Sequence, residues 1–184
     1  NKILTLFGGI DILIANSGAA FQGSMLNVKK DILEKSLEVN FYSHHNIVQK
    51  IANIMVSQGF GGSISLNLSK QSINPGKDFG PYGIAKASSL FSMKQYALEF
   101  GKYNIRVNGI NADRIKSGLL TDQFIKERAK ARNMSSNKYL NNNLLQKQVT
   151  AEDVAEAFFA QLSFEKTTGN IITVDGGNIE ASLR

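Results

Sequence analysis

The chain has 184 residues, the length of one domain with a sizeable core, and carries a net charge of +6 from 21 Lys and Arg against 15 Asp and Glu. It contains no cysteine, which excludes disulfides and thiolate metal sites, and we expect a cytoplasmic location. No apolar run reaches the length of a membrane span, so we expect no membrane partner.

The positive charge makes nucleic-acid binding worth testing against the sequence. The densest basic run is Lys-Glu-Arg-Ala-Lys-Ala-Arg at residues 126–132, in a helical pattern without aromatic residues. Such a run is typical of a solvated helix face. We therefore expect no nucleic-acid partner. The alternative, a nucleic-acid-binding module, is supported only by the net charge.

The first strand signal is an almost continuous apolar run at residues 11–16. This pattern predicts a parallel strand that is covered on both faces. It ends in the turn Asn16-Ser17-Gly18, at the carboxyl edge where parallel sheets bind ligands. The turn could equally be structural, and both readings can hold together.

A long helical pattern follows from Val28 to about Ser57. His44 and His45 are adjacent in it, so their side chains point to different faces of the helix. We therefore expect no metal site there and predict ordinary surface or interface histidines.

The centre of the chain predicts a strand that passes into a helix. Residues 62–68 alternate as a short strand does, and Asn74-Pro75-Gly76 predicts a loop. A helix is expected to begin near Pro81, because a proline at the first helical position loses no hydrogen bond. The helix should run to about Phe100 and is apolar on more than one side, which indicates burial against two layers.

Three polar side chains meet at this junction. Ser69 lies at the carboxyl end of the predicted strand, and Tyr82 and Lys86 share one face of the helix because they are four residues apart. An ammonium group beside a phenol favours the phenolate and lowers the phenol pKa, which makes the tyrosine a candidate general acid and base. An isolated Tyr–Lys pair is common, and the serine thirteen residues upstream is what favours a catalytic reading.

The remaining segments complete an alternating pattern. Residues 105–111 predict a further strand, and residues 117–145 predict short helices whose polar, Asn-rich tract is typical of a mobile lid. Thr150 and Asp153 predict the start of a helix, and residues 171–177 predict the last strand.

These motifs resemble the short-chain dehydrogenase/reductase family, whose signature is a Ser, a Tyr about thirteen residues later and a Lys four residues after that. The match covers nearly the whole chain, from about residue 7 to residue 177. Four further segments agree in order: the turn Ala15-Asn16-Ser17-Gly18, the pair Val39-Asn40, residues 105–111 and residues 171–177.

The resemblance implies an α/β fold with a Rossmann-like doubly wound parallel sheet. No strand, glycine turn and helix precede residue 11 in that order, and the glycines at 8–9 and 59–62 lead into strands. We therefore expect residues 1–184 to form a single partial domain. It should be the C-terminal part of the sheet, with about four strands and flanking helices, without the glycine-rich cofactor-binding unit.

The resemblance also implies an oxidoreductase that acts on a CH–OH group of a small alcohol or carbonyl compound. In that family pattern Tyr82 moves the proton, Lys86 lowers its pKa and holds the cofactor ribose, and Ser69 orients the substrate oxygen. Asn40 anchors a water that relays protons to the lysine. The alternative is a catalytically inactive fragment that binds no cofactor and serves as a folding and dimerisation unit.

The resemblance implies NAD or NADP as the cofactor. The two are not distinguished, because the residue that selects between them belongs to the absent glycine-rich unit. Departures from the family occur after residue 111, where Ala and Asp occupy the usual Pro-Gly positions and a Ser replaces the usual Thr. The implied cofactor-binding residues are Asn16, Ser17, Gly18, Tyr82, Lys86, Ala112, Asp113, Ile115 and Ser117.

The run from Asn111 to Leu120 resembles the dehydrogenase half of bifunctional aldolase/short-chain dehydrogenases, the rhamnulose-phosphate-aldolase-like group. That closer resemblance implies a sugar-derived alcohol or aldehyde. Family resemblance further implies a homodimer or homotetramer that forms through the helices beginning at Val28 and at Tyr82.

Overall fold

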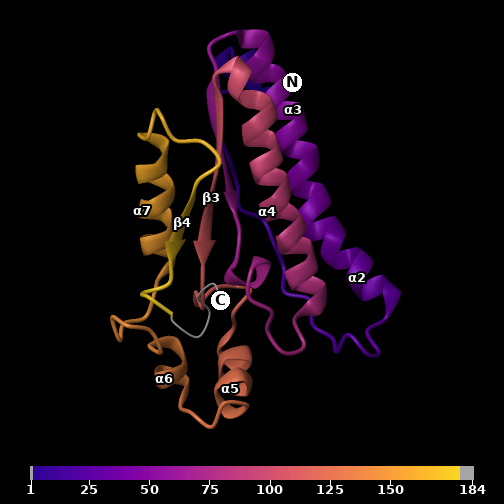
Figure 1. Ribbon diagram of the computed structural model, residues 1–184, viewed down its shortest axis with the longest axis vertical. Helices are drawn as coiled ribbons and strands as arrows, with labels where there is room; N and C mark the ends of the chain where they lie inside the picture. The colour runs from indigo at the N-terminus through magenta and orange to yellow at the C-terminus, as the bar shows by residue number, and fades with distance from the viewer. Residues whose placement is uncertain (1, 179–184) are drawn as a thin grey trace.

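A parallel sheet forms the centre of the structure, a computed structural model that describes residues 2–178 (Figure 1). Its neighbouring strands all run parallel, in the order β1-β2-β3-β4. The strands are β1 (Ile12–Ala15), β2 (Gly62–Asn67), β3 (Ile105–Ala112) and β4 (Ile171–Val174). The predicted α/β fold with about four parallel strands is confirmed.

Helices flank this sheet on both sides (Figure 1). The predicted helix from Val28 to Ser57 exists but contains a π-helical turn, Glu38–Tyr42. The long elements on one side are α2 (Lys30–Leu37), α3 (Ser43–Gln58) and α4 (Gly80–Phe100), and α7 (Ala151–Leu162) lies on the other. The short ones are α1 (Lys2–Phe7), α5 (Asp122–Lys130), α6 (Ser136–Leu140) and the 3-10 turns Lys70–Ser72 and Gly101–Tyr103.

Two buried clusters hold the layers together. The larger lies between the sheet and helices α3 and α4, and it includes Val48, Met55, Ile64, Leu66, Met93 and Val107. The smaller lies under α7 and includes Ile110, Val154 and Phe158. Strand β3 therefore has apolar contacts on both faces of the sheet, which hold it in place.

Strand β1 differs from its prediction. Ile12 and Ile14 are 50% and 43% exposed, whereas Ala15 is buried. Helix α3 contacts β1 from one side, and α7 contacts β3 and β4. Because α7 does not reach β1, one face of that strand is uncovered among residues 2–178, and the prediction of a strand covered on both faces is wrong.

The start of α7 confirms the predicted capping. The Thr150 hydroxyl accepts a hydrogen bond from the Asp153 amide, and the Asp153 carboxylate accepts one from the Thr150 amide. This reciprocal arrangement satisfies two amides at the helix start. Across residues 2–178, none of the helices has the length and apolar character needed to cross a membrane.

Candidate active site

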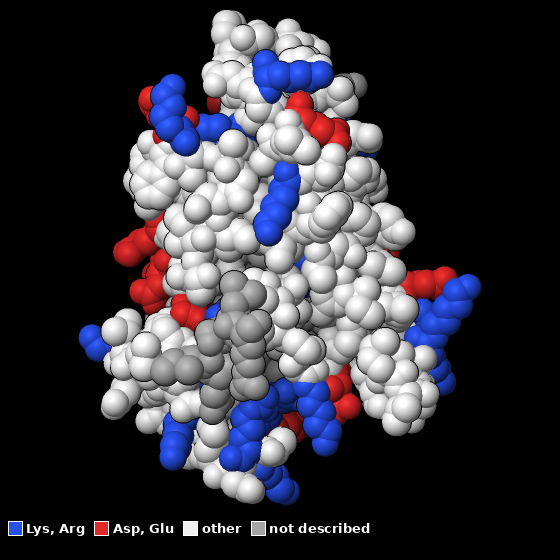
Figure 2. All heavy atoms as spheres, in the orientation of Figure 1, with Lys and Arg blue, Asp and Glu red and all other residues white. Residues whose placement is uncertain are grey.

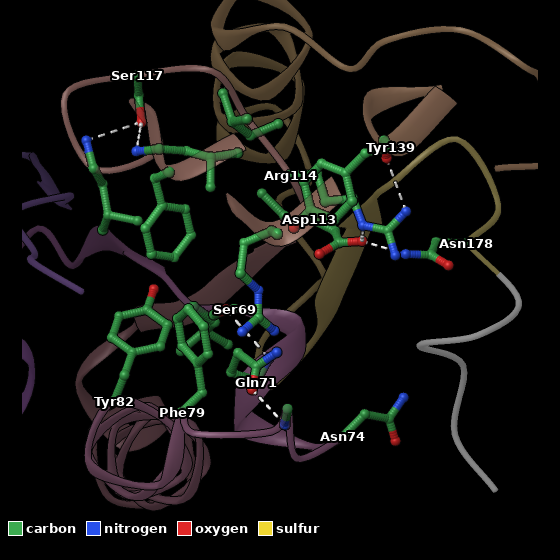
Figure 3. A pocket seen from close by; sticks show the side chains of 18 of the residues that line it. Ser69, Gln71, Asn74, Phe79, Tyr82, Asp113, Arg114, Ser117, Tyr139 and Asn178 are labelled. Atoms are coloured by element: carbon green, nitrogen blue, oxygen red, sulfur yellow. Dashed lines mark hydrogen bonds and ion pairs between the residues drawn. The ribbon is translucent and has the colours of Figure 1, made fainter. Parts of the chain in front are cut away.

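A pocket of about 320 Å³ lies where β2 and β3 end. Ser69 follows β2, Asp113 follows β3, and Tyr82 comes from the first turn of α4. Figure 3 shows Tyr82 and Ser69 on one side of this pocket, with Asp113, Arg114 and Tyr139 on the other. The carboxyl ends of parallel strands are where open α/β sheets bind ligands, so the pocket is the candidate active site.

Ser69 and Tyr82 both line the pocket, and the Ser69 side chain acts on the phenol by lowering its pKa. Ser69 has extended backbone and also accepts a hydrogen bond from the Gln71 amide at 3.2 Å, which fixes its position ahead of the 3-10 turn. Burial raises the pKa of the Tyr82 phenol, and the Ser69 side chain offsets only part of that increase. The phenol is therefore held protonated, as a donor.

Lys86 lies under this pair and is only 2% exposed. Its Nζ atom donates a hydrogen bond to the main-chain oxygen of Asn67 at 2.8 Å and lies 5.8 Å from the centre of the Tyr82 ring. Burial lowers the pKa of Lys86 to about 8. We expected Lys86 to lower the pKa of Tyr82, but burial dominates and the pKa of the phenol rises.

Asn40 lies in the π-helical turn and is fully buried. Its side-chain amide donates to the main-chain oxygens of Ala19 and Ser36, and its Oδ1 atom accepts a hydrogen bond from the Ala19 amide at 3.0 Å. The main-chain oxygen of Asn40 accepts a hydrogen bond from the Ser89 hydroxyl. Asn40 therefore fixes the segment after β1, and its water-relay role stays a prediction.

The turn Asn16-Ser17-Gly18 lies outside the pocket lining. Asn16 Oδ1 accepts a hydrogen bond from Asn67 at 2.7 Å. A Cβ atom at Gly18 would lie 3.0 Å from Asn40 Oδ1 and 3.7 Å from Lys86 Nζ. The glycine therefore lets the turn approach Asn40 closely, next to the buried amine.

His44 differs from its prediction, because it is buried and not on the surface. Its Nε2 atom lies 2.7 Å from the main-chain oxygen of Ser17, which can only accept, so Nε2 carries the proton. Burial and the nearby Lys86 charge lower its pKa. His45 is partly buried and forms a hydrogen bond with the Tyr96 hydroxyl.

The end of β3 and the segment after it supply four of the predicted cofactor-binding residues to the pocket lining: Ala112, Asp113, Ile115 and Ser117. Asp113 is bound by the Asn178 amide and lies 3.6 Å from Arg114 Nε. Burial raises the pKa of the Asp113 carboxyl, and Arg114 and Asn178 offset part of the increase. Ser117 Oγ accepts hydrogen bonds from the main-chain amides of Leu119 and Leu120, so it stabilises the turn in which it lies.

An ion pair that the sequence did not reveal lies next to Ser69. Lys70 Nζ and Asp175 Oδ2 are 2.9 Å apart, and each side chain is 9% exposed. Asp175 also accepts a hydrogen bond from the Gly177 amide. The pair connects the segment after β2 to the segment after β4, next to the pocket residue Ser69.

Three arginines of the pocket lining were also missed: Arg114, Arg128 and Arg132. The last two belong to the run at residues 126–132, which we expected to be a solvated helix face. That expectation holds for Lys126 and Lys130, which are exposed, but it is wrong for the two arginines. Their four-residue spacing, which places them on one face, was the available signal.

The comparisons with known proteins agree with this geometry. A family model described as enoyl-(acyl carrier protein) reductase matches residues 1–178. The uncharacterized oxidoreductase YuxG of Bacillus subtilis (strain 168) is 31% identical over 179 residues, which are 93% of this chain and 26% of YuxG. L-rhamnose 1-dehydrogenase (NAD(P)(+)) of Sphingomonas sp. (strain SKA58) is 29% identical, over 96% of this chain and 68% of that protein.

Among solved structures, a short-chain type dehydrogenase/reductase from Mycobacterium marinum has a TM-score of 0.85 and 23% sequence identity. The match covers 96% of this chain and 68% of the other. By contrast, the chain spans only about a quarter of the length of YuxG. With a family model matched across the chain and the Ser69, Tyr82 and Lys86 pattern assembled at a strand end, this protein belongs to the short-chain dehydrogenase/reductase family.

Proposed function

We propose that this chain is the catalytic part of an NAD(P)-dependent oxidoreductase acting on a CH–OH group. The observation that carries the proposal is that Ser69 and Tyr82 line one pocket, with the buried Lys86 amine 5.8 Å from the centre of the Tyr82 ring. Two hydroxyl groups in one pocket provide both a hydrogen-bonding site for a substrate oxygen and a proton donor for it.

Proton transfer follows from the environment of Tyr82. Burial keeps the phenol protonated, which suits donation to the oxygen of a carbonyl compound during reduction. Ser69 orients that oxygen through its hydroxyl group. In the reverse direction the phenolate accepts the alcohol proton, and the positive charge of Lys86 beneath the ring stabilises that anion.

The residues near Lys86 fit the nicotinamide half of such a cofactor. Asn67 Oδ1 is buried without a hydrogen-bond partner among the described residues, beside the pocket and Lys86, and it can accept a bond from a ribose hydroxyl. A side chain at position 18 would crowd Asn40 and come within 4 Å of Lys86 Nζ, so Gly18 suits a close approach of the chain to this site. Tyr82, Lys86 and Asn67 would hold this half, with Asn16, Ser17, Ala112, Asp113, Ile115 and Ser117 around it. When bound, the nicotinamide supplies or accepts the hydride.

In doubly wound sheets, a glycine turn binds the cofactor phosphates. Among residues 2–178, no glycine turn leads from a strand into a helix ahead of β1, so the phosphates of a dinucleotide lack that cradle there. We propose that residues 1–184 are the C-terminal part of the family domain. A cofactor titration therefore decides between an active chain and the alternative, a folding and dimerisation unit.

For the substrate we propose a small sugar-derived alcohol or carbonyl compound. The resemblance of residues 111–120 to the dehydrogenase half of bifunctional aldolase/short-chain dehydrogenases supports this. The printed name of the Sphingomonas relative, a dehydrogenase of L-rhamnose, also supports it. The short span of YuxG that the chain matches is compatible with a larger parent protein.

We also propose a homodimer or homotetramer that forms through α3 and α4. Exposed apolar side chains on these two helices support this, because single exposed residues are normal but a series along adjacent helices is typical of an interface. They are Ile47, Val56, Ile84, Phe91 and Leu98. The absence of cysteine supports a cytoplasmic location.

The deciding experiment is reduction of small carbonyl compounds with NADH or NADPH, followed by nicotinamide absorbance. Tyr82→Phe should lower kcat by roughly 100-fold or more, because it removes the proton donor and keeps the ring. The matched control is Tyr103→Phe, which makes the same chemical change at a half-exposed position beyond the end of α4. Equal activity of Tyr82→Phe and the wild type would overturn the proposal.

Titration of nicotinamide fluorescence with the unmodified chain comes first. Saturable binding of NADH or NADPH supports the proposed activity. No response at millimolar cofactor would instead support the inactive folding and dimerisation unit.

A further inference from the structure

Asp113 stands at a position where the family resemblance gives a glycine, directly after β3. It lines the same pocket as Ser69 and Tyr82, and it is the one acidic residue in the described lining. In Figure 3 its side chain lies across the pocket from these two hydroxyl groups. The family pattern does not require a carboxylate here, so its chemistry belongs to the pocket of this chain.

Two neighbours hold the Asp113 carboxylate in one orientation. The Asn178 side-chain amide donates a hydrogen bond to Oδ2, and Arg114 Nε lies 3.6 Å from the same oxygen atom. A carboxylate has two acceptor oxygens, so this arrangement makes Oδ1 the oxygen that can meet a ligand. The Asp113 side chain is 18% exposed, which leaves the carboxylate within reach of a small molecule in the pocket.

The charged form of Asp113 is poorly solvated in this place. Burial raises the pKa of its carboxyl, and Arg114 and Asn178 offset only part of the increase. A further hydrogen-bond donor beside the carboxylate would replace some of the water that burial removes, and so would stabilise the charged form. The pocket thus offers an acceptor that gains from a ligand carrying a donor group.

A neutral hydroxyl group suits this acceptor better than a cation. Arg114 already compensates part of the Asp113 charge. The chain carries a net charge of +6, and Figure 2 shows Lys and Arg gathered at the lower end of the molecule, where Figure 1 places α5 and α6. A cationic ligand would therefore meet like charge as it approaches the pocket, whereas an alcohol group would not.

We propose that Asp113 accepts a hydrogen bond from a second hydroxyl group of the substrate, close to the reacting carbon, and so selects hydroxy-carbonyl compounds and diols over simple alcohols. This inference rests on the proposed function, which places the reacting oxygen at Ser69 and Tyr82. The substrate carbon must lie against the nicotinamide for hydride transfer, so a side chain beside that ring also faces the substrate. A small polyol fits a cavity of about 320 Å³.

The test measures binding to the unmodified chain without any cofactor. Chemical-shift titrations with pentan-1-ol, pentane-1,2-diol and pentane-1,3-diol compare ligands that share a carbon chain and differ in one hydroxyl group. At least one diol should bind roughly tenfold more tightly than pentan-1-ol, because it adds a hydrogen bond to a charged group. The two diols distinguish a hydroxyl group on the neighbouring carbon from one that lies a carbon further away.

Asp113→Ala should remove the diol preference, because the acceptor is lost. Asp113→Asn keeps the size of the side chain and should lower the preference by about threefold, and it decides the question if Asp113→Ala does not fold. The matched control is Asp122→Ala, which removes an exposed carboxylate outside the pocket lining and should keep the full preference.

Equal binding of pentan-1-ol and both diols, or no binding of either diol at hundreds of millimolar, would overturn the inference. An unchanged preference in the Asp113 variants would do so too, and so would an equal loss of affinity for all three ligands, which is the result of a purely structural role. Weaker binding of NADH or NADPH in Asp113→Ala with an unchanged diol preference would assign the carboxylate to the cofactor and would also overturn it.

These outcomes are separate from those of the activity test. A diol preference that depends on Asp113 can be present while Tyr82→Phe is as active as the wild type, in which case only the proposed reaction fails. Full loss of reduction in Tyr82→Phe with no diol preference would leave the proposed function standing and remove the role of Asp113 from it.

Discussion

Two lysine–aspartate pairs near the pocket have almost the same length in opposite surroundings. Next to Ser69, Lys70 and Asp175 are 2.9 Å apart and each side chain is 9% exposed. At the start of α5, Lys116 and Asp122 are 2.8 Å apart, but their side chains are 53% and 71% exposed. Distance alone would rank the two pairs as equal.

Burial makes the two pairs different in kind. An exposed pair is screened by water and contributes little to stability. Removing one partner of a buried pair leaves the other charge without compensation, which costs much more. The buried groups Lys70, Lys86 and Asn40 are therefore expected to be the rigid part of the site. The α5–α6 segment (residues 114–140) is expected to be the part that tolerates change.

The largest effect is expected from Asp175→Asn, which leaves the Lys70 ammonium buried beside a neutral amide. The free energy of unfolding should fall by about 2–3 kcal/mol, the lower range for a buried pair because both side chains keep some exposure. Asp122→Asn is the matched change in the exposed pair and should leave stability within error of the wild type. Urea denaturation at pH 7 measures both, and equal losses would remove the distinction between the pairs.

The Lys70–Asp175 pair also makes the stability of the fold depend on pH. Burial alone would raise the pKa of Asp175, but hydrogen bonds from Lys70 and the Gly177 amide outweigh it and the pKa lies below its ordinary value of 3.8. A lowered carboxyl pKa stabilises the fold above the ordinary pKa, and that stability is lost as the pH falls through the lowered value. Asp175→Asn should therefore reduce the stability loss that the wild type shows below about pH 4.

The arrangement of Ser69, Tyr82 and Lys86 was largely predictable from the sequence because it is set by short spacings. A serine at the end of a strand and a Tyr–Lys pair four residues apart on the next helix must meet where parallel strands end. The pKa of Tyr82 was not predictable in the same way. It depends on how completely the ring is covered. The Phe79 ring meets Tyr82 edge-on and is itself packed against Phe124, which comes from a distant segment of the chain.

Arg128 and Arg132 were missed as pocket residues because a helix pattern shows which residues share a face but not what that face contacts. Arg128 lies in α5, close to the buried Ile125 and Ala129, and Arg132 lies in the turn after the helix. The helix packs against α6, and this contact turns the arginines toward Phe79 and Tyr139. Asn67 was missed for a related reason, since its role comes from the neighbouring Asn16 and Lys86 and not from a motif.

The next largest effect on stability is expected from Lys86, a buried amine that can be compared with an exposed one on the same helix. Its folded pKa of about 8 lies below the ordinary 10.5, so between these values the unfolded chain holds a proton that the folded chain has released. The free energy of unfolding should then rise with pH, by roughly 2 kcal/mol from pH 8 to pH 10. Above pH 10 the raised pKa of Tyr82 opposes this rise, because the unfolded phenol ionises first.

Denaturation at pH 8 and pH 10 measures this rise. In Lys86→Met it should disappear, whereas Lys94→Met, at an exposed position on the same helix, should keep it. A rise of the same size in Lys86→Met would show that another group causes it.

The smallest effect compares two asparagines of the α2–α3 helix that make the same local bond. Asn40 donates to the Ser36 oxygen and Asn53 to the Gln49 oxygen, four residues earlier in each case. Only Asn40 also holds Ala19, and only Asn40 is buried. Asn40→Ala should cost about 1–2 kcal/mol by leaving the Ala19 amide and oxygen without partners, whereas Asn53→Ala should be near neutral. Thermal unfolding of both variants measures the difference, and equal melting temperatures would mean that the segment after β1 does not depend on Asn40.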